Sequence, residues 1–209
     1  MADRVPQALR TMLVAMLTAI GAGGSAYLGE QDRALAHAQL TEYLQAVAAD
    51  TSTSDAIKLA MVLGSYYESS YRHIGTPYVD RLGRGQPLTV CNGITGKDVV
   101  AGRYYTPADC YRLEKGRYQE AERFLSKSVP TYTAATVFQQ AVALDFVHNK
   151  GQGAFSTSTY RRKWIAGDTV GACRENERWK KGTVNGVLTV LPGLKTRGNA
   201  NSDLCAHGL

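Results

Sequence analysis

Apolar residues recur at helical spacing over most of this chain. The helices that this pattern predicts span residues 33–49, 56–68, 107–128 and 134–149. Ser54, Thr106 and Thr133 stand where the N-caps of the last three helices are expected, and Pro107 suits a first helical position. The last of these helices has the densest apolar content and is expected to be the central core helix.

Only one region is predicted to form a β-sheet. Residues 73–96 read as a β-ribbon that turns at Gly83, Gly85 and Pro87. Two further short helices are expected over 156–179, and residues 184–198 look irregular before a short final helix at 199–206. These elements predict an α+β fold with a small sheet lobe, a larger helical lobe and a cleft between them.

One carboxylate falls on the apolar spacing of a predicted helix. Ile57, Met61, Gly64 and Glu68 stand at i, i+4, i+7 and i+11, which places them on one helical face. The pattern therefore predicts that Glu68 lies on the side of the helix that faces the core. Partial desolvation there would raise its pKa, as a general acid requires.

A second carboxylate and a hydroxyl follow in the predicted ribbon. Asp80 precedes the glycine-rich turn, and Thr89 opens the apolar strand after it. Two carboxylates in different environments beside a hydroxyl suit acid/base hydrolysis of a glycosidic bond. Together with Glu68, these residues are the candidate catalytic group.

The N-terminal segment has the charge pattern of an export signal. Residues 11–29 carry no charge, Arg4 and Arg10 precede them, and Glu30 and Asp32 follow. This arrangement predicts an N-terminus inside the cell and an exported remainder. Four interpretations stay open: a signal peptide cut near Gly24 and Ala26, a permanent anchor, a signal-anchor that later leaves the membrane, and a buried helix.

The net charge of the chain narrows the choice of binding partner only slightly. The formal net charge is +6, and residues 161–209 contribute nine Lys/Arg and four Asp/Glu. A basic face suits an anionic polymer or surface, such as cell wall, anionic lipid or nucleic acid. The basic residues lack the interleaved aromatic residues of single-strand binders, so nucleic acid is disfavoured as a partner. No cysteine spacing indicates a metal site, and no cofactor is expected.

Several separate motifs follow one another along the chain: TVCNGITGKDVVAGRYYTPADC (89–110), FVHNKGQGAFSTSTYRRKWIAGDTVGAC (146–173), GLKTR (193–197) and a late LC (204–205). In this order they resemble the phage lysozymes of glycoside hydrolase family 24, and most of all the signal-anchor-release endolysins of lambdoid phages. The resemblance covers roughly residues 57–209.

The resemblance implies a muramidase that hydrolyses the β-1,4 bond between N-acetylmuramic acid and N-acetylglucosamine and thereby lyses the host cell. Glu68 corresponds to the general acid, Asp80 to the second carboxylate and Thr89 to the hydroxyl that positions water. The same logic implies two disulfides, Cys91–Cys110 and Cys173–Cys205, although four cysteines allow three pairings and could also remain free thiols.

The implied organisation is an export segment over 1–29, a helical linker or insertion over 30–53 and a lysozyme-like catalytic domain over 54–209. The implied partner is peptidoglycan, with the inner membrane as a temporary tether. The protein is expected in the host periplasm as a monomer. The insertion has no role in the family that the resemblance supplies.

Some residues depart from the family pattern. Glu68 and Asp80 are twelve residues apart, and the stretches from Glu68 to Asp80 and from Asp80 to Thr89 are both longer than usual. Asp98 is the alternative second carboxylate, and Ile94 stands where the family often has a histidine. Two rival functions remain: a lytic transglycosylase acting on the same bond, and a non-catalytic cell-wall-binding module.

Overall fold

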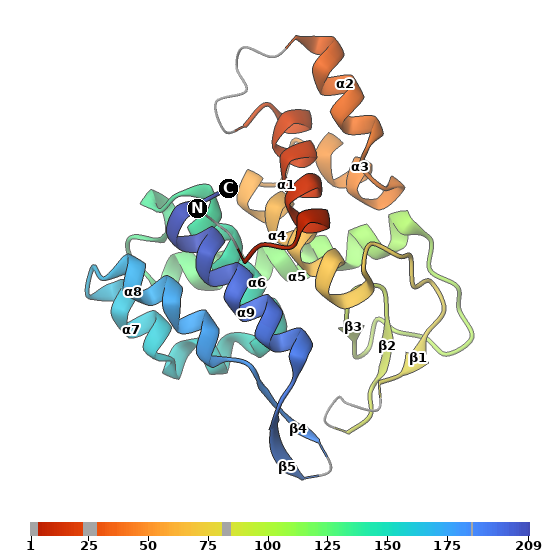
Figure 1. The fold of residues 1–209 in the computed structure, drawn as a ribbon. Helices are drawn as coiled ribbons and strands as arrows, with labels where there is room; N and C mark the ends of the chain where they lie inside the picture. Colours follow the sequence, from red (N-terminus) through yellow and green to blue (C-terminus); the bar gives the residue numbers. More distant parts are fainter. Residues whose placement is uncertain (1–3, 23–28, 81–84, 185) are drawn as a thin grey trace. The chain divides into compact units, whose positions relative to one another are not determined.

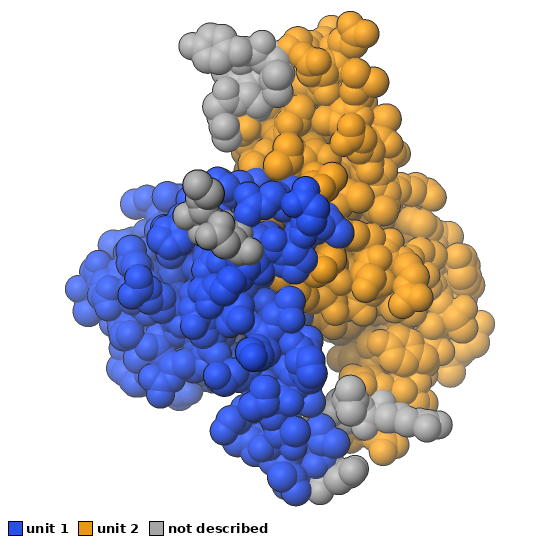
Figure 2. All heavy atoms as spheres, viewed as in Figure 1, with its two compact units in different colours: residues 1–10, 118–209 blue, residues 11–117 orange. Residues whose placement is uncertain are grey.

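The computed structural model describes residues 4–22, 29–80, 85–184 and 186–209. The predicted turn residue Gly83 lies outside these ranges, as do Gly24 and Ala26 of the proposed signal cleavage. The chain forms two compact units (Figure 2): unit 1 comprises residues 1–10 and 118–209, and unit 2 comprises residues 11–117. These packing units do not test the predicted functional segments, which stay predictions.

Unit 2 holds most of the first helix, three complete helices, the small sheet and the start of a further helix (Figure 1). Its elements are the larger part of α1 (Gln7–Ile20), α2 (Glu30–Ala38), α3 (Glu42–Ala49), α4 (Asp55–Ser69), β1 (Tyr78–Val79), β2 (Leu88–Val90), β3 (Ile94–Thr95) and the first part of α5 (Pro107–Ser128). The strands are antiparallel in the order β1-β2-β3. The β-ribbon predicted over 73–96 is therefore confirmed.

The prediction of one helix over 33–49 was wrong, because a cap divides it. The hydroxyl oxygen of Thr41 accepts a hydrogen bond from the Leu44 backbone N–H at 3.3 Å, and Thr41 itself has an extended backbone. A threonine in this geometry starts a new helix by satisfying a backbone donor that has no partner in the first turn. Residues 30–53 consequently form two short helices, α2 and α3.

Helix α4 begins as the sequence predicts and ends in an unusual way. The Ser54 hydroxyl oxygen accepts from the Ile57 N–H at 3.2 Å, which confirms Ser54 as the N-cap. Every residue from 56 to 65 is buried. The helix ends at Ser70 and Tyr71, whose φ values of 52° and 62° are costly for residues with a Cβ.

Unit 1 is mainly helical. After the second part of α5 it contains α6 (Val137–Thr157), α7 (Thr159–Ile165), α8 (Thr169–Arg174), β4 (Lys181–Val184), β5 (Val187–Val190) and α9 (Pro192–His207). Helix α9 packs against α6 and α8. A cluster of rings surrounds Phe146, whose centroid lies 4.9 Å from that of Trp179 and 5.4 Å from that of Tyr160.

Two predictions for unit 1 need correction. The cap of α6 is Thr136, which accepts from the Gln139 N–H, and not Thr133. Residues 184–198 are not irregular, because β4 and β5 pair as an antiparallel hairpin (Figure 1) and α9 begins directly after it. The short final helix is thus the second half of a 16-residue helix.

The N-terminal segment is part of the fold. Leu9, Leu13 and Met16 of α1 are fully buried, at the i, i+4, i+7 spacing of one helical face. Helix α1 ends in a Schellman motif, with Gly21 at φ 71° and the Ala22 N–H donating to the Leu17 carbonyl at 3.0 Å. Among the residues that the structure describes, no helix combines the length and hydropathy needed to cross a membrane.

Candidate active site

Glu68 is presented to solvent at the end of a buried helix. It is the second-last residue of α4, just before the left-handed residues that end the helix. The structure exposes its side chain, so the prediction that it faces the core was wrong. Because all of 56–65 is buried, the spacing of apolar residues in this helix carries no information about which face Glu68 occupies.

The other two predicted residues lie in the sheet of the same unit. The Asp80 N–H donates to the Pro87 carbonyl at 3.0 Å, which continues the pairing of β1 with β2 by one residue. Thr89 is directly opposite Tyr78 in that pairing. Since side chains two apart in a strand and directly opposite across a pair share a face, Tyr78, Asp80 and Thr89 lie on one face of the ribbon.

Tyr78 connects the two carboxylates. Its pKa is raised, first by burial and then by the negative charges of Asp80 and Glu68. Glu68 and Asp80, which come from a helix and a strand, therefore act on the same phenol. Sequence reasoning missed Tyr78, although its position two residues before Asp80 in a strand could have indicated a shared face.

Thr89 is buried and its hydroxyl is oriented. The side chain is 3% exposed, and its Oγ1 donates to the Pro87 carbonyl at 3.1 Å. With its hydrogen used in this bond, the oxygen can only accept from a further partner. A water beside it would therefore donate one hydrogen to Thr89.

Asp98, the alternative second carboxylate, is engaged elsewhere. Its Oδ2 lies 3.6 Å from Nη2 of Arg117, in a pair whose side chains are 39% and 45% exposed. Its backbone carbonyl accepts from the Tyr105 hydroxyl at 2.7 Å. Asp98 thus belongs to a surface ion pair, and no described contact brings it to Glu68.

A further carboxylate, Glu114 of α5, was missed by sequence reasoning. It is 1% exposed and accepts hydrogen bonds from the Tyr43 hydroxyl and from the backbone and side-chain nitrogens of Asn92, the latter two at 3.1 Å. Burial is the main reason that its pKa is raised to about 7, and the charge of Glu68 adds to that rise. Unit 2 therefore contains a buried carboxylate within electrostatic range of Glu68.

Each unit contains one disulfide. Cys91 at the end of β2 is bonded to Cys110 of α5, and Cys173 of α8 is bonded to Cys205 of α9. This is the pairing that the resemblance implied. The first bridge closes a loop of 19 residues and the second a loop of 32 residues. In the chain-entropy model, each is expected to stabilise the fold by about 3–4 kcal/mol.

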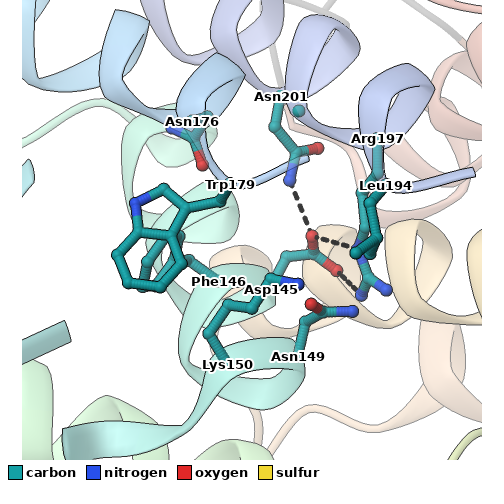
Figure 3. Close-up of a pocket in the computed structure, with 10 residues that line it drawn as sticks. Asp145, Phe146, Asn149, Lys150, Asn176, Trp179, Leu194, Arg197 and Asn201 are labelled. Carbon is teal, nitrogen blue, oxygen red and sulfur yellow. Dashed lines mark hydrogen bonds and ion pairs between the residues drawn. The ribbon is translucent and has the colours of Figure 1, made fainter. Parts of the chain in front are cut away.

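A small cavity of about 20 Å³ in unit 1 is no rival site (Figure 3). Its main polar group, Asp145, is fully buried and bonded to Arg197 and Asn201. The sticks in Figure 3 show the side chains of Asp145, Arg197 and Asn201 pointing toward one another. Their arrangement is that of an internal structural pair.

Solved structures similar to this one have the lysozyme fold. The active form of the P1 phage endolysin Lyz matches with a TM-score of 0.64 at 18% identity, over 79% of this chain and 92% of that chain. An endolysin from the Escherichia coli O157:H7 phage FAHEc1 matches with a TM-score of 0.62 at 20% identity, over 77% of this chain and 96% of that chain. The predicted lysozyme-like α+β class is therefore confirmed.

Sequence relatives agree. The family model described as phage lysozyme matches residues 73–201. The SAR-endolysin of Bacteriophage PS119 is 37% identical over 136 residues, which cover 63% of this chain and 74% of that protein. The SAR-endolysin of Enterobacteria phage P21 is 33% identical over 132 residues, with the same two coverages.

The fold thus defines a lysozyme-like protein, and the matched residues go further: the chain belongs to the phage lysozyme family. It is accordingly a glycoside hydrolase of the lysozyme type. The family match begins at residue 73 and so includes Asp80 and Thr89 but not Glu68.

Proposed function

We propose that the protein is an endolysin that hydrolyses the β-1,4 bond between N-acetylmuramic acid and N-acetylglucosamine in peptidoglycan, with Glu68, Asp80 and Thr89 as its catalytic residues. The observation that carries this proposal is the position of Tyr78. Burial and the negative charges of Asp80 and Glu68 raise the pKa of its phenol. Its partner in the neighbouring strand is Thr89.

In the proposed reaction, the Glu68 carboxyl protonates the glycosidic oxygen, and the bond from that oxygen to the muramic acid C1 breaks. The Asp80 carboxylate stabilises the positive charge that develops at C1. A water that donates to Thr89 and to Asp80 directs a lone pair at C1. The water oxygen adds there and one water proton passes to Asp80, which leaves a free reducing end. Asp80 then releases that proton to solvent, and Glu68 takes up a proton from solvent.

The experiment is clearance of outer-membrane-permeabilised Gram-negative cells by the full chain and its Glu68→Gln variant. We expect the substitution to abolish clearance, because an amide cannot supply the proton. Glu120→Gln is the matched control, since Glu120 is exposed in unit 1 and accepts a hydrogen bond from the side-chain amide of Gln152 at 3.4 Å.

Two further outcomes separate the rival functions. Released fragments with a reducing end support hydrolysis, whereas an anhydro sugar would indicate transglycosylation. Full clearance by Glu68→Gln would reject Glu68 as the acid, and wall binding without clearance by the parent would point to a binding module.

We also infer that residues 1–29 direct export and hold the chain at the inner membrane before release into the periplasm. The flanking charges support this, and so does the similarity to relatives that are SAR-endolysins. In the folded protein Leu9, Leu13 and Met16 are buried instead. The same apolar residues would then contact lipid before release and pack in the protein core after release.

Replacing Gly21, Gly23 and Gly24 with leucine tests this inference. The replacements lengthen the apolar stretch and strengthen membrane insertion, so lysis after induction should be delayed. Membrane fractionation should show the variant retained in the pellet. Lysis at the parental rate with the parental distribution would contradict the inference.

A further inference from the structure

Glu114 occupies a position on α5 that is otherwise apolar. The buried residues of this helix include Cys110, Tyr118, Ala121 and Leu125, which follow the i, i+4, i+8, i+11, i+15 spacing of one face when Glu114 is included. A carboxylate in such a stripe is costly to bury unless it is well hydrogen-bonded. Packing alone does not explain why a glutamate stands at position 114.

The first partner of Glu114 leads to the sheet. The backbone N–H of Asn92 donates to Oε1 and the side-chain amide of Asn92 donates to Oε2, both at 3.1 Å. Asn92 lies three residues after Thr89, in the turn between β2 and β3. Glu114 therefore fixes the turn that ends the strand on which Thr89 stands.

The second partner leads to the helical segment over residues 30–53. The Tyr43 hydroxyl of α3 donates to Oε2 of Glu114. A few residues later, Asp50 accepts from the Tyr111 hydroxyl and from Nζ of Lys115, the latter at 2.5 Å. Several polar contacts thus attach the segment over residues 30–53 to α5, and one of them ends on the buried carboxylate.

We propose that Glu114 is a positioning residue for the reaction: in its charged form it joins the strand of Thr89, through Asn92, to the α2–α3 segment, through Tyr43. This gives residues 30–53 a function as support for the catalytic sheet. The proposal rests on the proposed function, because Thr89 and Glu68 are assumed to be catalytic.

The charge of Glu114 is set by several neighbours. Glu68 on α4 opposes it, while the hydrogen bonds from Tyr43 and Asn92 favour it. Other titratable or charged side chains on the surrounding elements include Glu42 of α3, Tyr71, Arg72 and His73 after α4, and Tyr111 and Lys115 of α5. Within the described residues, the hydrogen-bond donors to Glu114 are all neutral.

Protonation would disturb this network unevenly. The two nitrogens of Asn92 can only donate, so a protonated Glu114 oxygen needs another acceptor, and only the Tyr43 hydroxyl can reverse its role. A cavity of about 100 Å³ is lined by both partners of Glu114, Tyr43 and Asn92, and by the Cys91–Cys110 pair. Because Oε2 accepts from both partners, its protonation would weaken the hold on Asn92.

The test is the pH dependence of kcat and KM for hydrolysis of purified peptidoglycan by the full chain, from about pH 5 to about pH 9. We expect a step in kcat near pH 7 in the parent, with more activity on the alkaline side, where Glu114 is charged. Glu114→Gln should lose about tenfold in kcat above the step, with KM little changed, and should lack the step. Tyr43→Phe should move the step to higher pH, because the hydrogen bond it removes favours the charged carboxylate.

Glu42→Gln is the matched control, since Glu42 is an exposed neighbour of Tyr43 on α3, and it should keep the parental profile. A parental profile in both Glu114→Gln and Tyr43→Phe would overturn the proposal. If Glu114→Gln does not fold, Tyr43→Phe decides alone: an upward displacement of the step supports the proposal, and an unchanged step rejects it.

Failure of the proposed function would look different. Hydrolysis by Glu68→Gln would reject Glu68 as the acid, yet the effects of Glu114→Gln and Tyr43→Phe on the step would still report on positioning. A purely structural role for Glu114 would lower activity equally at all pH values and leave the step in place, which also overturns the proposal.

Discussion

The two units each bury a carboxylate, and they stabilise it in different ways. In unit 1, Asp145 is fully buried and receives Nε and Nη2 of Arg197 at 2.9 and 2.6 Å, with Asn201 at 2.7 Å. In unit 2, Glu114 is equally buried but receives only neutral donors from Tyr43 and Asn92. The pKa of Glu114 is raised to about 7 by its burial.

The two carboxylates therefore differ in what compensates their burial: an opposite charge for Asp145, and neutral donors for Glu114. A bidentate guanidinium supplies a full opposite charge inside the protein, so removing either partner leaves an uncompensated ion. Neutral donors offset burial only in part, so the carboxyl group can change its charge near neutral pH. Burial alone therefore does not tell which of two acids is available for function.

The largest effect is expected from breaking the pair in unit 1. Asp145→Asn leaves the Arg197 guanidinium buried without a counter-charge, and should lower the free energy of unfolding by about 3–5 kcal/mol. Urea unfolding at neutral pH measures this. A loss below about 1 kcal/mol would mean that Asp145 and Arg197 behave as a surface pair, and the comparison would fail.

The next effect concerns how stability depends on pH. The pKa of Glu114 rises on folding from its ordinary value of 4.5 to about 7, so the folded state binds the proton more tightly. The free energy of unfolding should therefore fall, by up to about 3 kcal/mol, as the pH increases from below 4.5 to above about 7. Urea unfolding across this range should show a flatter dependence for Glu114→Gln, and identical slopes would contradict the assignment.

A smaller effect is expected from the neutral donor itself. Tyr43→Phe removes one hydrogen bond to the charged form of Glu114, and should cost about 1–2 kcal/mol at about pH 8. At about pH 5, where Glu114 is protonated, the loss should be smaller. Thermal unfolding at the two pH values checks this, and an equal loss at both would indicate a packing effect of the hydroxyl.

The smallest effect is expected at an exposed pair. Arg117→Ala removes the partner of Asp98, at 3.6 Å with both side chains well exposed, and should change the free energy of unfolding by less than about 1 kcal/mol. The same urea experiment measures it. A loss as large as that of Asp145→Asn would show that burial is not what distinguishes these pairs.

The spacing of apolar residues is informative on one helix, where it was not used, and misleading on another. In α5, charged residues surround a single apolar stripe, so the spacing of Cys110 and Tyr118 could have placed Glu114 inside. In α4, ten consecutive buried residues leave no polar side to define a face, and Glu68 was wrongly placed toward the core. The spacing of apolar residues identifies the buried face of a helix only where the helix also has a solvent-exposed face.

Other structural features differed in how far the sequence could predict them. Ser54 and the ribbon of β1 to β3 followed from local rules for caps and turns. The β4–β5 hairpin was missed because Val187, Leu188 and Val190 are all exposed, so β5 shows no alternation of burial. The meeting of Glu68 with Asp80 near Tyr78 depends on tertiary packing, which no local pattern in this chain encodes.

The contact between Arg4 and Asp203 has a consequence for the order of folding. Nε of Arg4 donates to Oδ1 of Asp203 at 3.1 Å and its backbone N–H donates to Oδ2 at 3.0 Å, across 199 residues. On a chain that is synthesised from its N-terminus, Arg4 must wait until nearly the whole polypeptide has emerged. Closure of so long a loop is a late and slow step. Unit 1, which contains both residues, is therefore completed only after synthesis of its last helix.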